Sequence, residues 1–445
     1  MTRAPRSTVP VDEASYDRLR LSQWLAGRAR GDGMSRRGVL TLLAAGTAAL
    51  ALPAPVRAAA ATSPGIVKPL PDEWFTLRGT NAETKWEALR GTGYLTPADR
   101  FFVRNHTSTP VVDTTTWRLR VWGSGLRGGT GLDDAVEFGL DDLRALPPVE
   151  HTAFVECAGN GRSFYTSQQG QSVSGTAWTL GAVGVARWRG ARLSDVLRRA
   201  GITRHAVDVM PRGLDDEYVT GGVGLGRVRR PLPVAKALDD VILAYEMNGE
   251  PLPYDHGRPV RVLVPSWAGI SSVKWVGDIE VSAEPLYSPW NTDFYRLFGP
   301  GFPEAGSAPL TRQTLKSAFE LEAGAAFPAG VRSVLHGRSW SGAGGVRRVE
   351  VSTDGGATWR RAGLRDVPRR DGWVRWSVPW RPRTPGPAVL LARATDTAGR
   401  TQPDEAVFNT QGYFFDAVVR HPVVVAGRDV AGGDRPGRSM YDADH

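Results

Sequence analysis

The stretch FVECAGNGR, residues 154–162, contains Cys157, the only cysteine in a chain of 445 residues. An apolar strand end precedes the cysteine, and Gly159 and Gly161 permit positive φ angles and close approach of the backbone. These small neighbours leave the sulfur open to an approaching group, and Arg162 favours the thiolate, the form that attacks electrophiles and binds metals. A lone cysteine is also often a small buried apolar residue, so its role depends on the segments around it.

Three further segments place polar side chains where a strand begins or ends. The segment FFVRNH, residues 101–106, delivers Arg, Asn and His in succession, which suits an anionic ligand. Residues 244–265, AYEMNGEPLPYDHGRPVRVLVP, combine an Asn-Gly turn with a loop that carries Asp, His and Arg. In SSVKW, residues 271–275, small hydroxyls and a lysine can cradle a phosphate. Taken singly these segments are weak evidence, and FFVRNH alone also fits a solvated turn.

Taken in order, the segments resemble one known family. FFVRNH, ECAGNGR, ARWRGARLSDVL, AYEMNGEPLPYDHGRPVRVLVP and SVKWVG are similar in order and spacing to the sulfite oxidase family of molybdopterin enzymes, in its exported bacterial form without a haem domain. The resemblance runs from about residue 70 to about residue 426. It implies an α+β fold, in which a mixed α/β molybdopterin-binding domain is followed by an all-β immunoglobulin-like sandwich. It also implies molybdenum bound to molybdopterin as the cofactor, and oxygen-atom transfer as the reaction.

The resemblance assigns roles to particular residues. Cys157 is implied as the thiolate ligand of the metal. The implied cofactor-binding positions are Phe102, Val103, Arg104, Asn105, His106, Cys157, Asp215, His256, Arg261, Ser272, Val273 and Lys274. The implied catalytic positions are Tyr295, Arg104, Arg162 and Cys157, where the arginines draw in an oxyanion and the tyrosine hydroxyl assists proton transfer. We also expect Trp188 to form a wall of the substrate pocket.

One position departs from the family pattern. The sulfite oxidases of the family carry a further arginine in an Asn-Leu-Arg-Gly context, whereas residues 409–412 read NTQG and place Gln411 there. A charge-assisted hydrogen bond contributes about 1.5–3 kcal/mol, so affinity for a dianion such as sulfite is expected to fall about tenfold or more. The predicted substrate is a small sulfite-like sulfur oxyanion, with a sulfoxide or nitrate as the alternative.

The chain is predicted to contain four parts. Residues 1–58 form a twin-arginine export signal, because SRRGVL at 35–40 precedes a short apolar run and an alanine-rich exit. We predict a molybdopterin-binding catalytic domain over 59–305, an immunoglobulin-like dimerisation domain over 306–426 and a flexible tail over 427–445. The signal predicts a periplasmic, extracellular or cell-envelope location, and translation can start at Met1 or Met34.

Local patterns predict the elements of the two domains. Residues 193–200 read as a helix closed at Gly201, and residues 117–122 and 260–264 read as strands. A cluster of Gly and Pro over 299–309 marks the domain boundary. Beyond it, strands are expected at 346–352, 373–378 and 389–394, with a turn at Asp354-Gly355-Gly356, which is the pattern of a β-sandwich.

Composition excludes several other classes of protein. One cysteine excludes an intrachain disulfide, a multi-cysteine zinc site and a Cys-x-x-Cys-His haem attachment. We therefore expect electrons to leave to an external acceptor such as a c-type cytochrome. The formal charge is +9, but residues 1–58 contribute +5 of it and no basic–aromatic stripe is present, so no nucleic-acid partner is expected.

Two alternatives from other classes stay open at this point. Cys157 could be the nucleophile of a hydrolase or transferase, with His106, His151 or His256 as the base. The chain could also be an exported binding module with a vestigial cofactor pocket, for which Gln411 is the only support. The preferred interpretation remains the molybdenum enzyme, assembled as a homodimer through its C-terminal domain.

Overall fold

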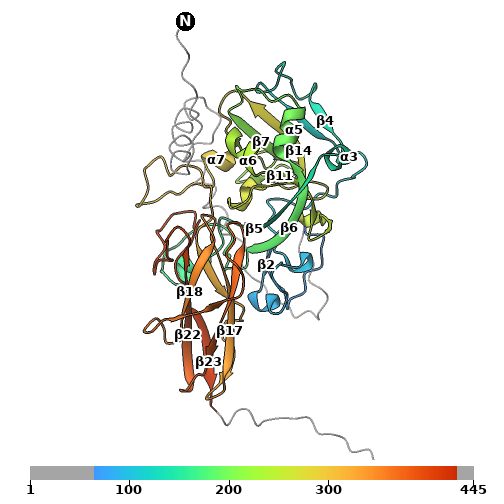
Figure 1. Cartoon of the computed structure of the whole chain (residues 1–445). Helices are drawn as coiled ribbons and strands as arrows, with labels where there is room; N and C mark the ends of the chain where they lie inside the picture. The colour runs from blue at the N-terminus through green and yellow to red at the C-terminus, as the bar shows by residue number, and fades with distance from the viewer. Residues whose placement is uncertain (1–64, 428–445) are drawn as a thin grey trace, which may run out of the picture.

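The computed structural model describes residues 65–427. Within this range the chain forms two parts, a mixed part at the top of Figure 1 and a sandwich of orange and red strands below it. The predicted export signal and nearly all of the predicted tail lie outside the described residues. No helix within residues 65–427 is long and apolar enough to cross a membrane.

The first sheet of the upper part has the strand order β10-β7-β14-β3-β4. Its strands are β3 (Leu119–Trp122), β4 (Val136–Phe138), β7 (Asp208–Gly213), β10 (Leu232–Pro233) and β14 (Val276–Ser282). β14 pairs in parallel with β3, and the other neighbours are antiparallel. Leu119 and Val121 are buried while the residues between and after them are half-buried, which confirms the strand predicted from alternation.

The second sheet carries the cysteine segment. Its order is β12-β11-β6-β5, with β13 also paired to β11. The strands are β5 (Pro148–Glu156), β6 (Val183–Arg192), β11 (Ile242–Met247), β12 (Glu250–Pro251) and β13 (Arg261–Leu263). β5 and β6 pair antiparallel along their whole length, and the last pair joins Glu156 to Val183. Cys157 therefore follows directly where β5 ends.

Short helices and short strands complete the upper part. The predicted helix at 193–200 is confirmed as α5 (Leu193–Arg199), and Gly201 follows with a φ of +87°. The remaining short elements are β1 (Phe75–Arg78), β2 (Asn81–Thr84), η1 (Trp86–Leu89), η2 (Ala98–Arg100), α3 (Leu140–Arg144), α4 (Ser163–Ser167), β8 (Val219–Thr220), β9 (Val223–Gly224), α6 (Val234–Asp239), η3 (Tyr254–His256), η4 (Gly269–Ser271) and α7 (Pro289–Thr292).

The lower part contains two sheets and no helix among its described residues. One sheet has the order β15-β17-β21-β20, with β15 (Lys316–Phe319), β17 (Ser333–Trp340), β20 (Gly363–Leu364) and β21 (Trp373–Trp380). The other has the order β16-β23-β22-β18-β19, with β16 (Ala326–Pro328), β18 (Val346–Ser352), β19 (Arg360–Arg361), β22 (Gly386–Asp396) and β23 (His421–Ala426). Side chains of both sheets, among them Leu335, Val349, Trp376 and Leu390, share one core. The three predicted strands fall on β18, β21 and β22, whereas the immunoglobulin-like subclass stays a prediction.

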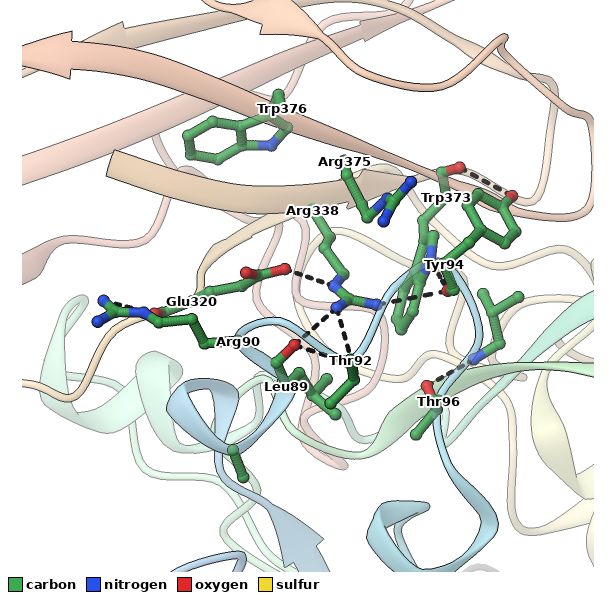
Figure 2. A network of polar contacts seen from close by, with 12 residues as sticks. Leu89, Arg90, Thr92, Tyr94, Thr96, Glu320, Arg338, Trp373, Arg375 and Trp376 are labelled. Atoms are coloured by element: carbon green, nitrogen blue, oxygen red, sulfur yellow. Dashed lines mark hydrogen bonds and ion pairs between the residues drawn. The ribbon is translucent and has the colours of Figure 1, made fainter. Parts of the chain in front are cut away.

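A buried arginine of the sandwich holds the N-terminal segment against it (Figure 2). Arg338 on β17 is 1% exposed and donates to Glu320 Oε1 at 2.7 Å. Its Nη2 donates to the Leu89 carbonyl at 3.0 Å and to Thr92 Oγ1 at 3.3 Å. The guanidinium also lies 4.4 Å from the centre of the Trp373 ring. This network therefore connects the segment around Leu89 and Thr92 to the sandwich.

Candidate active site

Segments far apart in the sequence meet around one cavity in the upper part. It has about 710 Å³ of empty space, part of which is open to solvent. The predicted site residues that line it are Phe102, Arg104, Asn105, His106, Cys157, Asp215, His256, Arg261, Ser272, Val273, Lys274 and Tyr295. Val103 and Arg162 are not among the lining residues and lie behind them. The fold therefore places twelve side chains from separate segments around one cavity, a proximity that local sequence patterns do not show.

The cysteine lies in a tight turn after β5. Its backbone N–H donates to the Ala182 carbonyl at 3.0 Å, and its own carbonyl accepts from Asn160 at the same distance. Gly161 has a φ of +93°, which favours glycine at that position. The Cys157 side chain is 8% exposed and lines the cavity. The turn thus presents one sulfur atom to the space where a ligand would bind.

The FFVRNH segment contributes a cation and a neutral donor. Burial opposes the charge of Arg104, but the neighbouring Tyr295 and Cys157 raise its pKa overall, so the guanidinium stays charged. Burial lowers the pKa of His106 well below its usual value, so the ring is neutral. His106 Nε2 accepts from Trp290 Nε1 at 3.1 Å, because an indole N–H can only donate. The proton of His106 therefore resides on Nδ1.

A second group of cations lines another wall of the cavity. Arg261 donates to the His256 carbonyl at 3.1 Å and to the Ser272 carbonyl at 2.9 Å, and burial lowers its pKa to about 9. Lys274 donates to the Asp255 carbonyl at 2.8 Å and to Asn105 Oδ1. Burial, together with Arg261, lowers the pKa of Lys274 well below its usual value. An anion bound between these groups would stabilise their charged forms.

Four lining residues have a buried polar atom without a hydrogen-bond partner. These atoms are Arg104 Nη1, Asp215 Oδ1, His256 Nε2 and Arg261 Nε. Burial also raises the pKa of Asp215 to about 6. An unpaired buried polar atom costs about 1–3 kcal/mol, so four of them around one cavity indicate that a polar ligand belongs there. The donors suit an anionic group, and the Asp215 carboxylate suits ligand N–H groups.

One lining residue of the cavity, Tyr295, stacks on a second tyrosine. Tyr295 has a φ of +56°, a rare backbone conformation of the kind found at functional sites. Its ring stacks on Tyr413 with centroids 5.1 Å apart and 13° between the planes. The guanidinium of Arg162 lies 5.1 Å from the centre of the Tyr413 ring. Sequence reasoning missed Tyr413, although it lies two residues after Gln411 in a stretch already singled out.

Gln411 lies beside Arg162 rather than in the cavity lining. Its carbonyl accepts from Arg162 Nε at 2.9 Å, and its Nε2 donates to the Asp293 carbonyl at 2.9 Å. Gln411 Oε1 is buried without a partner. Gln411 therefore contributes a hydrogen-bond acceptor, but no positive charge, to the surroundings of Tyr295 and Tyr413.

Two expected positions support the site from behind. Val103 pairs with Ala82 through two backbone hydrogen bonds of 2.9 Å, which fixes the strand end that carries the neighbouring arginine. Trp188 was expected to form a wall of the substrate pocket, but the structure places it elsewhere. It is fully buried and donates to the Ala153 carbonyl at 3.0 Å, and Arg261 lies 5.0 Å from the centre of its ring. Trp188 therefore supports a cavity arginine and does not line the cavity.

Comparison with known proteins decides the family. The model for the oxidoreductase molybdopterin binding domain matches residues 106–290, and that for the Mo-co oxidoreductase dimerisation domain matches residues 326–425. Sulfite oxidase from Arabidopsis thaliana is 31% identical, and the match covers 75% of this chain and 88% of that protein. The chain belongs to the sulfite oxidase family of molybdopterin oxidoreductases.

Further relatives place the chain within this family. Mitochondrial sulfite oxidase from Homo sapiens is 38% identical over 370 residues, which are 78% of this chain and 65% of the human protein. The chain thus spans just under two thirds of that relative. The crystal structure of the sulfane dehydrogenase SoxCD from Paracoccus pantotrophus matches with a TM-score of 0.63 and 26% identity, over 77% of this chain and 84% of that one. The fold is the sulfite oxidase type, composed mostly of sheet with few helices.

Membership in the sulfite oxidase family implies molybdenum bound to molybdopterin, and the cavity fits this cofactor. Arg261 and Lys274 would hold its phosphate, and the unpaired Asp215 oxygen would accept from the pterin N–H groups. Within residues 65–427 no group of three His, Cys, Asp or Glu side chains could hold a metal ion without help. Cys157 would be the soft protein ligand of the metal, and the cofactor would supply further ligands.

Proposed function

We propose that this protein oxidises a small sulfur oxyanion by oxygen-atom transfer and passes the electrons to an external carrier. The observation that carries the proposal is that Cys157, Arg104 and Tyr295 line one cavity around which four buried polar atoms lack protein partners. When bound, the molybdenum cofactor supplies the two-electron redox chemistry and the transferable oxygen atom. The protein supplies binding, orientation and charge.

Arg104 and Tyr295 have distinct tasks in this account. Arg104 keeps its charge inside the cavity and attracts an oxyanion toward the sulfur of Cys157. Burial raises the pKa of Tyr295, so its hydroxyl is protonated and can donate a hydrogen bond or hold a proton during turnover. Stacking on Tyr413 fixes the Tyr295 ring, which keeps the hydroxyl in one place.

The relatives and position 411 support the proposed substrate class. Both the sulfite oxidases and the sulfane dehydrogenase are named for the oxidation of a sulfur species. Gln411 adds no positive charge beside Arg162, so we expect weaker binding of a dianion than in a protein with arginine there. This difference changes the affinity for sulfite and leaves the class of reaction as proposed.

The wider setting is also part of the proposal. The match to a dimerisation domain over residues 326–425 supports a homodimer formed through the sandwich. The SRRGVL segment at 35–40 supports export by the twin-arginine route to the periplasm or cell envelope. The electron acceptor would be a separate protein such as a c-type cytochrome.

Kinetics of the wild type and the Gln411→Arg variant test the proposed function. Protein is purified from a molybdenum-replete host, and cytochrome c or dye reduction is followed with sulfite. We expect turnover in both proteins. The KM for sulfite should be lower in the variant by about tenfold or more. Folded protein without molybdenum, or loaded protein that turns over no sulfur compound, would overturn the proposal. Unaltered sulfite kinetics in Gln411→Arg would refute the role given to that position.

A further inference from the structure

The residue before the metal-binding cysteine points into a fully buried polar cluster. Glu156 Oε1 accepts from Lys316 Nζ at 2.7 Å and from Asn160 Nδ2 at 2.9 Å, and Oε2 accepts from Trp340 Nε1 at 2.9 Å. The side chains of Glu156 and Lys316 are 0% and 2% exposed. No lining residue of the cavity belongs to this cluster, so cofactor binding leaves its role unexplained.

Two of the three donors come from the other domain. Lys316 is the first residue of β15 and Trp340 is the last residue of β17, and these two residues pair across the edge of the sandwich sheet. Gln313, just before β15, donates to the Glu156 backbone carbonyl at 2.7 Å. The sandwich and the segment leading into it thus bind both the carboxylate and the carbonyl of Glu156.

The third donor joins this cluster to the turn that carries the sulfur. Asn160 donates to Glu156 through its side chain, and its backbone N–H donates to the Cys157 carbonyl at 3.0 Å. Asn160 Oδ1 accepts from the Ala182 N–H at 3.0 Å, and the Ala182 carbonyl accepts from the Cys157 N–H at 3.0 Å. Asn160, and through it Ala182, therefore connects the turn to Glu156.

We infer that Glu156 is a positioning residue for Cys157, through which Lys316 and Trp340 of the sandwich domain fix the sulfur for molybdenum. The sandwich domain then has a second role besides dimerisation, because it sets the geometry of the metal–thiolate bond. The Glu156–Lys316 ion pair is buried away from water, so separating its charges is costly and the pair keeps its geometry. The cysteine turn is therefore held in place by the sandwich. The inference rests on the proposed role of Cys157 as the metal ligand.

The test compares the Glu156–Lys316 pair with a second buried carboxylate–cation pair, which lies within the sandwich. Glu156→Gln keeps the shape of the side chain and removes the charge that Lys316 faces, and Trp340→Phe removes one donor while both charges stay. The matched control is Glu320→Gln, because Glu320 is a buried carboxylate that pairs with Arg338 rather than contacting the cysteine turn (Figure 2). All variants are purified as full-length, cofactor-loaded protein from a molybdenum-replete host.

The readouts are spectroscopic and do not depend on turnover. Molybdenum content is measured first, followed by the electron paramagnetic resonance spectrum of the one-electron-reduced metal and the thiolate-to-molybdenum charge-transfer absorption. We expect Glu156→Gln and Trp340→Phe to shift both spectra and to lose about tenfold or more in metal loading or kcat/KM. Glu320→Gln is expected to give the wild-type spectra.

The outcomes separate this inference from the proposed function. Loaded Glu156→Gln and Trp340→Phe with wild-type spectra would overturn the positioning role, as would an equal shift in Glu320→Gln. If Glu156→Gln fails to fold, the double variant Glu156→Gln/Lys316→Met removes the unpaired charge, and the same spectra are then decisive. If loaded Cys157→Ser gives the same thiolate-to-molybdenum absorption as the wild type, the assignment of Cys157 fails and this inference fails with it.

Discussion

The buried pair between Glu156 and Lys316 allows a stability prediction that needs no cofactor. Lys316→Met removes the ammonium and leaves a carboxylate that is 0% exposed with only the Asn160 and Trp340 donors. Breaking a buried ion pair by removing one partner destabilises a protein by about 3–5 kcal/mol, because the remaining charge is desolvated and uncompensated. We expect a loss of this size in the free energy of unfolding.

The double variant makes the prediction specific. In Glu156→Gln/Lys316→Met no charge is left buried, so we expect it to recover about 2 kcal/mol or more relative to Lys316→Met. The control is Asp195→Asn, whose partner Arg198 is 64% exposed, and an exposed pair contributes about 0–1 kcal/mol.

Equilibrium unfolding of the cofactor-free protein in guanidinium chloride is the assay. Tryptophan fluorescence and circular dichroism are both recorded, because two domains can unfold in separate transitions. A Lys316→Met variant that loses less than about 1 kcal/mol would refute the reasoning. So would a double variant that is as unstable as the single one.

Two further predictions concern charge and pH. Arg104→Met should lower kcat/KM for sulfite about tenfold or more per molybdenum, and Arg104→Lys should recover part of the loss, which steady-state kinetics at fixed ionic strength would show. Equal losses for a neutral sulfur substrate would contradict the role of the charge. Burial lowers the pKa of His106 and of His256 well below 6.5, so the unfolded chain binds protons that the folded chain does not. Stability of the cofactor-free protein should therefore be complete above about pH 6.5 and fall below it, by at most ~1.4 kcal/mol per pH unit for each histidine. His256→Gln should flatten this fall in denaturation series from pH 7.5 to 5, and an unchanged slope would refute it.

Much of the fold follows from local pattern. The strand at 346–352 matches β18 because alternating side chains face a shared core, and the helix at 193–200 matches α5 because a left-handed glycine ends it. The resemblance also assembled most of the cavity from separate motifs. Export, the domain boundaries and the individual roles of the site residues remain predictions.

The remaining features depend on tertiary contacts that no local pattern contains. The motif around Trp188 predicts a wall of the substrate pocket, but the residue is completely buried and its ring packs against Arg261. Tyr413 acquires its place only by stacking on Tyr295, more than a hundred residues earlier in the chain. Glu156 sits next to the cysteine, yet its partner Lys316 is 160 residues away, so neither residue alone indicates the pair.

The central claim is that the sulfur of Cys157 binds molybdenum. X-ray absorption at the molybdenum K-edge tests it most directly, on loaded wild-type protein and on Cys157→Ser with its pterin content measured in parallel. The account predicts a thiolate sulfur in the wild-type coordination shell that is replaced by a lighter neighbour in Cys157→Ser. Identical coordination shells in the two loaded proteins would contradict it.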